Sequence, residues 1–252
     1  IGFQVAAKLH GYAPRYIPQT PDYRYDIPAL AAAITPRTKI LYLANVNNPT
    51  GTYFNTEEFI WLMERVPEHV LVIMDEAYCE YSKALVPHFL DSLSYRYPTM
   101  LTLRTFSKVY GLAGLRVGYG IAGSDIIAPM MRAKLPFDPN TLGQIAAIAA
   151  LDDHEFLERT VALNTRGIQE FTAAFTRMGL RFPASAGNFV MIDCQTPEMA
   201  QNVYMGLLQK GFITRPLGGF SLPHCVRVST GTDEQNAGFI QAMESVAHLI
   251  TG

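Results

Sequence analysis

The stretch that decides the fold begins with the apolar run KILYLA (39–44) and ends with VLVIM (70–74), with a helical pattern between them. Asn55 followed by Glu58 has the form of a capping box, in which two side chains satisfy free N–H groups at the start of a helix. The apolar residues that follow share one helical face: Phe59, Leu62 and Val66. Short continuous apolar runs are typical of strands in a parallel sheet that is covered on both faces. The order strand, helix, strand therefore predicts a βαβ unit and an α/β fold.

Two further apolar runs, TMLTL (99–103) and VGYGIA (117–122), extend the predicted sheet. A helical pattern then covers residues 141–178 and stops at Gly179, a residue that suits the end of a helix. The sequence thus predicts a large domain over residues 1–155, with a mostly parallel sheet and helices on both of its faces.

The last hundred residues mix the two patterns in a different order. Apolar runs predict strands over 189–192 and 226–229. Thr232 and Gln235 form a second capping-box pattern. The apolar stripes of two helices complete this part: Met199, Val203 and Leu207, then Phe239, Met243, Val246 and Ile250. We expect a smaller α+β domain over residues 156–252, joined to the first through a long helix.

The composition is that of a globular protein, because 49% of the 252 residues are hydrophobic and 17% are charged. A net charge of -2 gives no electrostatic reason to expect nucleic acid or an anionic membrane as a partner. No apolar run approaches the ~18 residues of a membrane span, and no signal peptide is visible. The cysteines are few and widely spaced, which predicts neither a disulfide framework nor a metal cluster and fits the cytoplasm. They are Cys79, Cys194 and Cys225.

Polar segments follow three of the predicted strands directly. They are NVNNPTG (45–51), DEAY (75–78) and RTFSK (104–108). Ligands of such sheets bind at the carboxyl ends of the strands, so we expect these segments to form one site.

Lys108 is unusual for a solvated surface, where most lysines lie. It stands in TFSKVYGLAGLRVGY (105–119), between the aromatic Phe106 and Val109 and ahead of three glycines and an arginine. An amine placed in this way suits Schiff-base chemistry. Pyridoxal phosphate is the cofactor that lysines commonly hold through a Schiff base. Its ring nitrogen, ring oxygen and phosphate each need a partner in the protein.

The same segments offer a partner for each polar end of that cofactor. Asp75 could pair with the ring nitrogen, and Tyr78 and Asn48 could donate to the ring oxygen. Arginine and hydroxyl groups could hold the phosphate, and the candidates are Thr105, Ser107 and Arg116. Ordinary alternatives are a helix cap at Asp75, a packed tyrosine, an Asn-Pro turn and a surface arginine.

In this order and spacing, the motifs Asn48-Pro49-Thr50-Gly51, Asp75-x-x-Tyr78, Ser107-Lys108 and Arg116 resemble those of the fold-type I aminotransferases. The resemblance covers the whole chain. It implies that Lys108 holds pyridoxal phosphate and then acts as the acid and base of the proton shift. It also implies the roles suggested above for the other residues, and a homodimer with sites near its interface. The subgroup that the chain resembles most is that of the histidinol-phosphate aminotransferases, through NNPTGT (47–52), DEAYCEY (75–81) and RPLGGFSLPHCVRVSTGT (215–232).

This resemblance also suggests substrates. Arg227 matches an arginine that binds the α-carboxylate of the amino donor, and Asn188 matches an asparagine beside it. Arg215 matches a position that contacts the phosphate of the substrate. The implied partners are glutamate, 2-oxoglutarate and a phosphorylated amino alcohol, in histidine biosynthesis. From the residues alone, Arg227 could instead face outward in its strand, Arg215 could be a solvated arginine and Asn188 a turn residue.

Other members of the family leave alternatives open. These are an aromatic or broad-specificity aminotransferase, a threonine-phosphate decarboxylase, and the aminotransferase-like sensor domain of a transcription regulator. The chain begins at Ile1 and lacks the family's N-terminal stretch with its glycine-rich phosphate loop, so we expect it to be a piece of a longer protein rather than a truncated product. Residues 1–252 alone should bind pyridoxal phosphate weakly, because an arginine and hydroxyls would replace a full anion nest.

Overall fold

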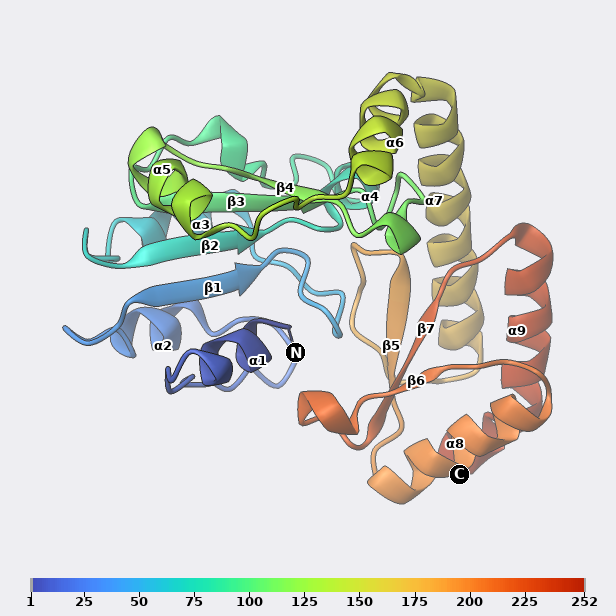
Figure 1. Ribbon diagram of the computed structural model, residues 1–252. Coiled ribbons are helices and arrows are strands. Elements are labelled where there is room, and N and C mark those ends of the chain that lie inside the picture. Colours follow the sequence, from blue (N-terminus) through green and yellow to red (C-terminus); the bar gives the residue numbers. More distant parts are fainter. Residues whose placement is uncertain (1, 252) are drawn as a thin grey trace.

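The computed structural model describes residues 2–251, so Ile1 and Gly252 lie outside the described part. Its first sheet has the order β1-β2-β3-β4 (Figure 1). Strands β1 (Ile40–Ala44), β2 (Leu71–Asp75) and β3 (Met100–Thr105) are parallel, which confirms three of the predicted strands.

The fourth predicted strand, β4 (Gly118–Ile121), is confirmed but runs antiparallel to β3. A parallel neighbour would need a crossover, usually through a helix. The residues between β3 and β4 instead form turns and one short 3-10 helix, Ala113–Leu115, so the chain returns beside the strand that it has just left.

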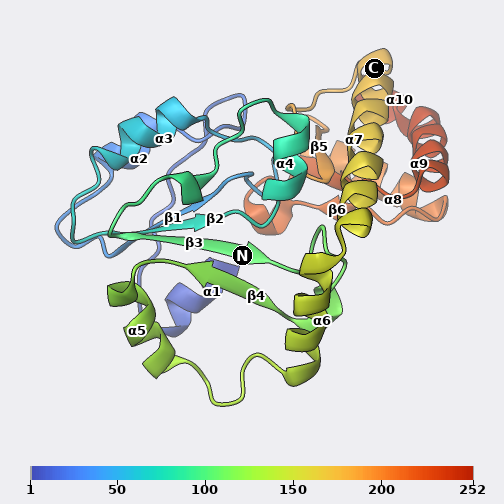
Figure 2. The ribbon, with the colours of Figure 1, turned by 90° about the horizontal axis from the view of Figure 1, so that it is seen from above.

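Helices cover both faces of this sheet. Helices α2 (Ile27–Ala32) and α3 (Thr56–Met63) lie on one face, and α1 (Gly2–Leu9) and α5 (Ser124–Ala133) lie on the other (Figure 2). The capping box of Asn55 and Glu58 is present at the start of α3. Leu43 and Met74 from the strands are fully buried with Phe59 from α3, which makes this face the main core of the first part.

The predicted helical segment over residues 141–178 consists of two helices, α6 (Thr141–Asp152) and α7 (His154–Arg177). The break lies at Asp153, whose carboxylate accepts a hydrogen bond of 3.0 Å from the N–H of Phe156 and so caps α7. Gly179 follows α7 with a φ of 70°, a conformation that favours glycine, as expected at the end of a helix. The predicted domain boundary near residue 155 stays a prediction.

The second sheet has the order β5-β7-β6 and is antiparallel. Its strands are β5 (Phe189–Asp193), β7 (Cys225–Ser229) and the short β6 (Arg215–Pro216). Helices α8 (Pro197–Gln209), α9 (Asp233–Val246) and α10 (His248–Thr251) pack with α7 on one face of it. The predicted capping box begins α9, and the predicted stripes meet in one core: Phe171, Phe175, Val203, Leu207 and Phe239. Ile250 is buried as predicted, but it belongs to the separate helix α10.

The carboxyl ends of β1, β2 and β3 point toward this second sheet (Figure 1). Close backbone contacts fix the approach, since the N–H of Ala186 donates to the carbonyl of Gly51 at 2.9 Å. A Cβ atom on Gly51 would lie 2.3 Å from Oγ of Ser185, and its φ is 79°, so this position requires glycine. The α4 helix (Cys79–Leu85) adds a second link, in which Oγ of Ser82 donates to the carbonyl of Ala186 at 2.8 Å. Among residues 2–251, no helix has both the length and the apolar character that crossing a membrane requires.

Candidate active site

Lys108 lies in the turn between β3 and β4 and is half-buried. Backbone hydrogen bonds hold this turn, from the N–H of Gly111 to the carbonyl of Lys108 and from that of Leu112 to the carbonyl of Phe106. The Lys108 ammonium is 5.2 Å from the centroid of the Tyr78 ring. Within the described residues no ion pair involves this amine, so it is available to a ligand.

Three of the predicted residues form a hydrogen-bonded chain beside that lysine. The side-chain amide of Asn48 donates to the hydroxyl of Tyr78 at 3.3 Å. The Arg227 guanidinium in turn donates to the side-chain oxygen of Asn48. These residues come from the segment after β1, the segment after β2 and strand β7, so the two sheets meet at the site.

The place of Arg227 in an alternating strand would have allowed it to face outward. In the structure it faces the site instead. Its guanidinium carbon lies 4.7 Å from the centroid of the Phe189 ring, and its Nε is buried without a hydrogen-bond partner in the described part of the chain. Burial lowers the pKa of the guanidinium and the neighbouring Arg215 lowers it further, while Tyr78 opposes this. A half-buried cation with a buried, unused N–H is costly unless an anion pairs with it. The arrangement is therefore suited to a carboxylate ligand.

The other two predicted substrate residues lie close by. Arg215 is the direct cross-strand partner of Arg227 and is exposed. Asn188 is half-buried just before β5, and its carbonyl accepts a hydrogen bond of 3.0 Å from the N–H of Thr230. Two arginines side by side could bind a substrate that carries two anionic groups, one buried and one at the surface.

Asp75 ends β2 and is half-buried. One carboxylate oxygen accepts a hydrogen bond of 3.1 Å from the N–H of Ala77, so Asp75 does shape the turn. The other oxygen accepts a hydrogen bond from the hydroxyl of Tyr42 on β1. A carboxylate can accept more than these two bonds, so one face of it is open to a further donor. Tyr42 was not predicted from the sequence, although its place between Leu41 and Leu43, which are buried, signals that it faces the opposite side of the sheet.

The predicted phosphate ligands share the loop that carries Lys108. The N–H of Ser107 donates to Oγ1 of Thr105 at 3.0 Å. Arg116 is exposed, has a φ of 57°, and donates to the carbonyl of Ala113 at 2.9 Å. The loop thus ties the Ser107 backbone to the Thr105 hydroxyl, while the described contacts of Arg116 do not join it to either residue.

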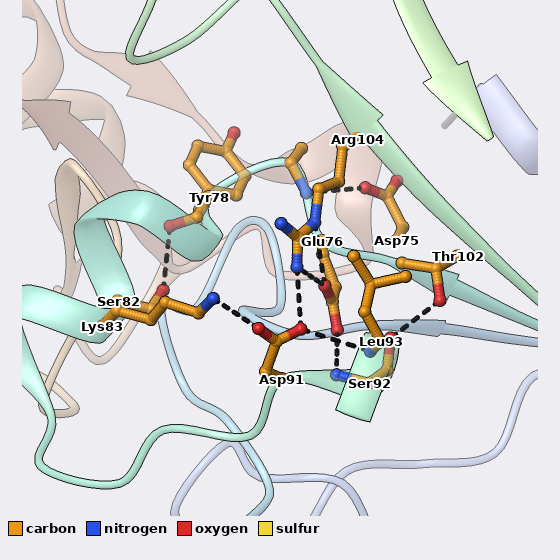
Figure 3. Close-up of polar contacts among 11 residues, drawn as sticks. Asp75, Glu76, Tyr78, Ser82, Lys83, Asp91, Ser92, Leu93, Thr102 and Arg104 are labelled. Atoms are coloured by element: carbon orange, nitrogen blue, oxygen red, sulfur yellow. Dashed lines mark hydrogen bonds and ion pairs between the residues drawn. The ribbon is translucent and has the colours of Figure 1, made fainter. Parts of the chain in front are cut away.

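A buried charged network lies behind Asp75 and Tyr78 (Figure 3). The carboxylate of Glu76 is 1% exposed and accepts hydrogen bonds of 3.2 and 2.8 Å from the guanidinium of Arg104. Arg104 also donates to Asp91 at 2.9 Å, and Asp91 pairs with Lys83 at 2.5 Å. We call the Glu76–Arg104 pair the brace, because it ties the end of β2 to the end of β3. The brace was not predicted from the sequence, although both of its residues lie within the predicted polar segments 75–78 and 104–108.

One group of metal-binding residue types lies elsewhere. Ligand atoms of Asp193, His224 and Cys225 are within 4.8 Å of one another. The Tyr23 hydroxyl already donates to Asp193 at 2.9 Å and lies 3.2 Å from Nε2 of His224. This hydroxyl satisfies the polar atoms of the group without an ion.

The main site fits pyridoxal phosphate. It offers a lysine amine without an ion-pair partner among the described residues, a strand-end carboxylate with acceptor capacity, and the amide and hydroxyl of Asn48 and Tyr78. The buried Nε of Arg227 adds a place for a carboxylate.

The comparison with known families agrees with this geometry. The sequence profile described as "Aminotransferase class I and II" matches residues 2–243. The chain belongs to this family. Among curated aminotransferases, it is 46% identical over 89% of its length to histidinol-phosphate aminotransferase 2 of Ralstonia nicotianae. It is 44% identical, over the same share, to histidinol-phosphate aminotransferase 1 of Nitrosococcus oceani. The chain spans 60% of the length of each of these two aminotransferases.

Solved aminotransferase structures share the fold. The histidinol-phosphate aminotransferase of Sinorhizobium meliloti, determined in complex with pyridoxal-5'-phosphate, superposes with a TM-score of 0.88 and 30% sequence identity. That match covers 98% of this chain and 67% of the other. It confirms the predicted fold class, a fold-type I aminotransferase with a mostly parallel sheet and a second α+β part.

Proposed function

We propose that the protein containing this chain is a pyridoxal-phosphate-dependent aminotransferase of histidine biosynthesis. The observation that carries the proposal is the contact chain Arg227–Asn48–Tyr78, which ends beside the Lys108 amine. The Arg227 cation, which would bind a carboxylate, thus contacts Asn48 directly, and Asn48 and Tyr78 are the donors proposed for the ring oxygen of the cofactor. That spacing suits an amino acid whose α-carbon must lie over Lys108.

Each residue has a part in this proposal. Pyridoxal phosphate, when bound, supplies the electron sink that makes an α-proton of an amino acid acidic. Lys108 holds the cofactor, then takes a proton from the substrate α-carbon as a general base and returns one as a general acid. Asp75 pairs with the ring nitrogen, and Asn48 and Tyr78 donate to the ring oxygen. Thr105, Ser107 and Arg116 bind the phosphate group.

The substrates follow from the two arginines and from the relatives. Arg227, with Asn188 nearby, binds the α-carboxylate of glutamate or 2-oxoglutarate. Arg215, exposed beside it, binds the phosphate of a phosphorylated amino alcohol, histidinol phosphate. The names of the curated relatives support this choice. We further propose a homodimer in the cytoplasm, where buried free cysteines such as Cys79 and Cys194 stay reduced.

The first test is a pair of half-reactions on the full-length protein. Glutamate should convert the visible spectrum of the lysine-bound cofactor to that of the amino form, and histidinol phosphate should do the same. Phenylalanine and threonine phosphate serve as competing substrates, which rank the alternative activities. Lys108→Ala should abolish the absorbance of the lysine-bound cofactor. If that absorbance persists, Lys108 is not the attachment site and the proposal fails.

The second test separates the two arginines. Arg215→Ala should raise the KM for histidinol phosphate at least tenfold, which corresponds to about 1.4 kcal/mol, and change the KM for glutamate little. The reason is that only the phosphorylated substrate reaches Arg215. Equal losses with both substrates would remove its special role. Arg132, exposed in α5, provides the matched control Arg132→Ala, which should change neither KM.

A further inference from the structure

The hydroxyl of Tyr42 is aimed at the site by the pleat of the sheet. Leu41 and Leu43 on either side of it are buried in the core against α3. Tyr42 therefore points to the other face, which also carries Ile73 and Asp75. Tyr42 pairs in register with Ile73, so Asp75 lies two residues further along the neighbouring strand. A tyrosine is long enough to reach that carboxylate diagonally.

The hydrogen bond between the two side chains has a fixed direction. Burial and the nearby Asp75 carboxylate raise the pKa of the Tyr42 hydroxyl, so the phenol keeps its proton and donates it. The Phe3 ring of α1 stacks on the Tyr42 ring with centroids 4.6 Å apart, which holds the ring in place. With the N–H of Ala77 on its other oxygen, Asp75 is held at both ends of its carboxylate.

We propose that Tyr42 is a positioning residue, which orients the Asp75 carboxylate toward the cofactor's ring nitrogen and withdraws part of its negative charge. The inference rests on the proposed function, because it needs a bound pyridoxal phosphate. The other titratable groups around the pair are Tyr25, whose hydroxyl accepts a hydrogen bond of 3.0 Å from the N–H of Ala44, and Tyr78, with Lys108 over its ring. Tyr42 is the one of these whose hydroxyl bonds directly to Asp75 in the described structure.

The test compares Tyr42→Phe with the wild type in the full-length protein loaded with pyridoxal phosphate. The variant removes one hydroxyl and keeps the ring. We expect the cofactor to dissociate roughly tenfold more readily, the effect of losing a hydrogen bond to a charged group. The midpoint of the pH titration of the visible absorbance should rise, because a less neutralised Asp75 favours the protonated form of the lysine-bound cofactor. The kcat should fall, while the KM for glutamate stays within about twofold.

Tyr25→Phe is the matched control. It removes a buried hydroxyl from the same region but no hydrogen bond to Asp75, so it should lower thermal stability without moving the absorbance midpoint. If Tyr42→Phe matches the wild type in cofactor retention and midpoint, or if Tyr25→Phe shifts the midpoint equally, the positioning role is refuted. A wild type that shows no lysine-bound absorbance would refute the proposed function itself. The two failures are therefore distinguishable.

Discussion

Arg227 shows a conflict between stability and binding at the scale of a single residue. Its guanidinium lies over the Phe189 ring, and its buried Nε finds no partner among the described residues. Asn48 satisfies one N–H, but a neutral amide does not balance a buried positive charge. Active sites often keep such destabilising groups because the ligand supplies the missing partner.

Replacing Arg227 with methionine should therefore stabilise the folded protein and weaken binding. An unsatisfied buried donor costs about 1–3 kcal/mol, and the lost contacts with Asn48 and Phe189 offset part of this. We expect the free energy of unfolding in urea, measured without substrate, to rise by about 1 kcal/mol. The KM for glutamate should rise strongly in the same variant. Arg132→Met, at an exposed position, should change neither quantity. A clear loss of stability in Arg227→Met would mean that the arginine is a structural residue.

At the scale of elements, the brace holds the two strand ends on which the site depends. Glu76 lies between Asp75 and Tyr78 in the chain, and Arg104 directly precedes Thr105 and the Lys108 turn. The N–H of Ser92 donates to the second carboxylate oxygen of Glu76 at 2.9 Å. A fully hydrogen-bonded buried pair of this kind specifies one relative position of the two strands, which keeps the segments before and after it in register.

Breaking the brace on one side should be costly. Arg104→Met leaves the Glu76 carboxylate buried and without its cation, so we expect a loss of about 3–5 kcal/mol in the free energy of unfolding. Glu76→Gln combined with Arg104→Met should lose much less, since no buried charge remains. Lys83→Met, which removes the partly exposed partner of Asp91, should cost at most about 1 kcal/mol. Urea unfolding of the four proteins gives the comparison. A double variant as unstable as Arg104→Met would argue against the charge as the cause.

The contrast between elements shows what the sequence could predict. Apart from the short β6, the strands follow from local patterns, as do both capping boxes and the polar strand ends, so they were predicted with nearly correct limits. The direction of β4 depends on how the Lys108 turn folds, and the spacing of apolar residues in the sequence does not predict that. Tyr42 and the brace depend on which side chains meet across neighbouring strands. Such pairs become visible only when the register is known.

At the scale of the whole molecule, one apolar surface is left uncovered. The segment from the end of α5 through the following loop to α6 exposes large apolar side chains, namely Met130, Met131, Leu135, Phe137, Leu142, Ile145, Ile148 and Leu151. The residues from α6 follow one another at intervals of three positions, so each lies next to the following one on the surface of that helix. Soluble proteins rarely leave a large contiguous apolar surface exposed to water, and such a surface usually marks a place where another protein segment binds.

Residues 1–252 produced alone should therefore self-associate and bind the dye ANS. Light scattering and ANS fluorescence measure the two effects. The double change Leu142→Glu and Ile145→Lys places charges on this surface of α6, and we expect it to lower both signals. Ile213→Lys is the control, because Ile213 is 84% exposed but lies outside the apolar surface, so it should change either signal little. Equal reductions by the control and the double variant would mean that added charge in general, and not this surface, governs association.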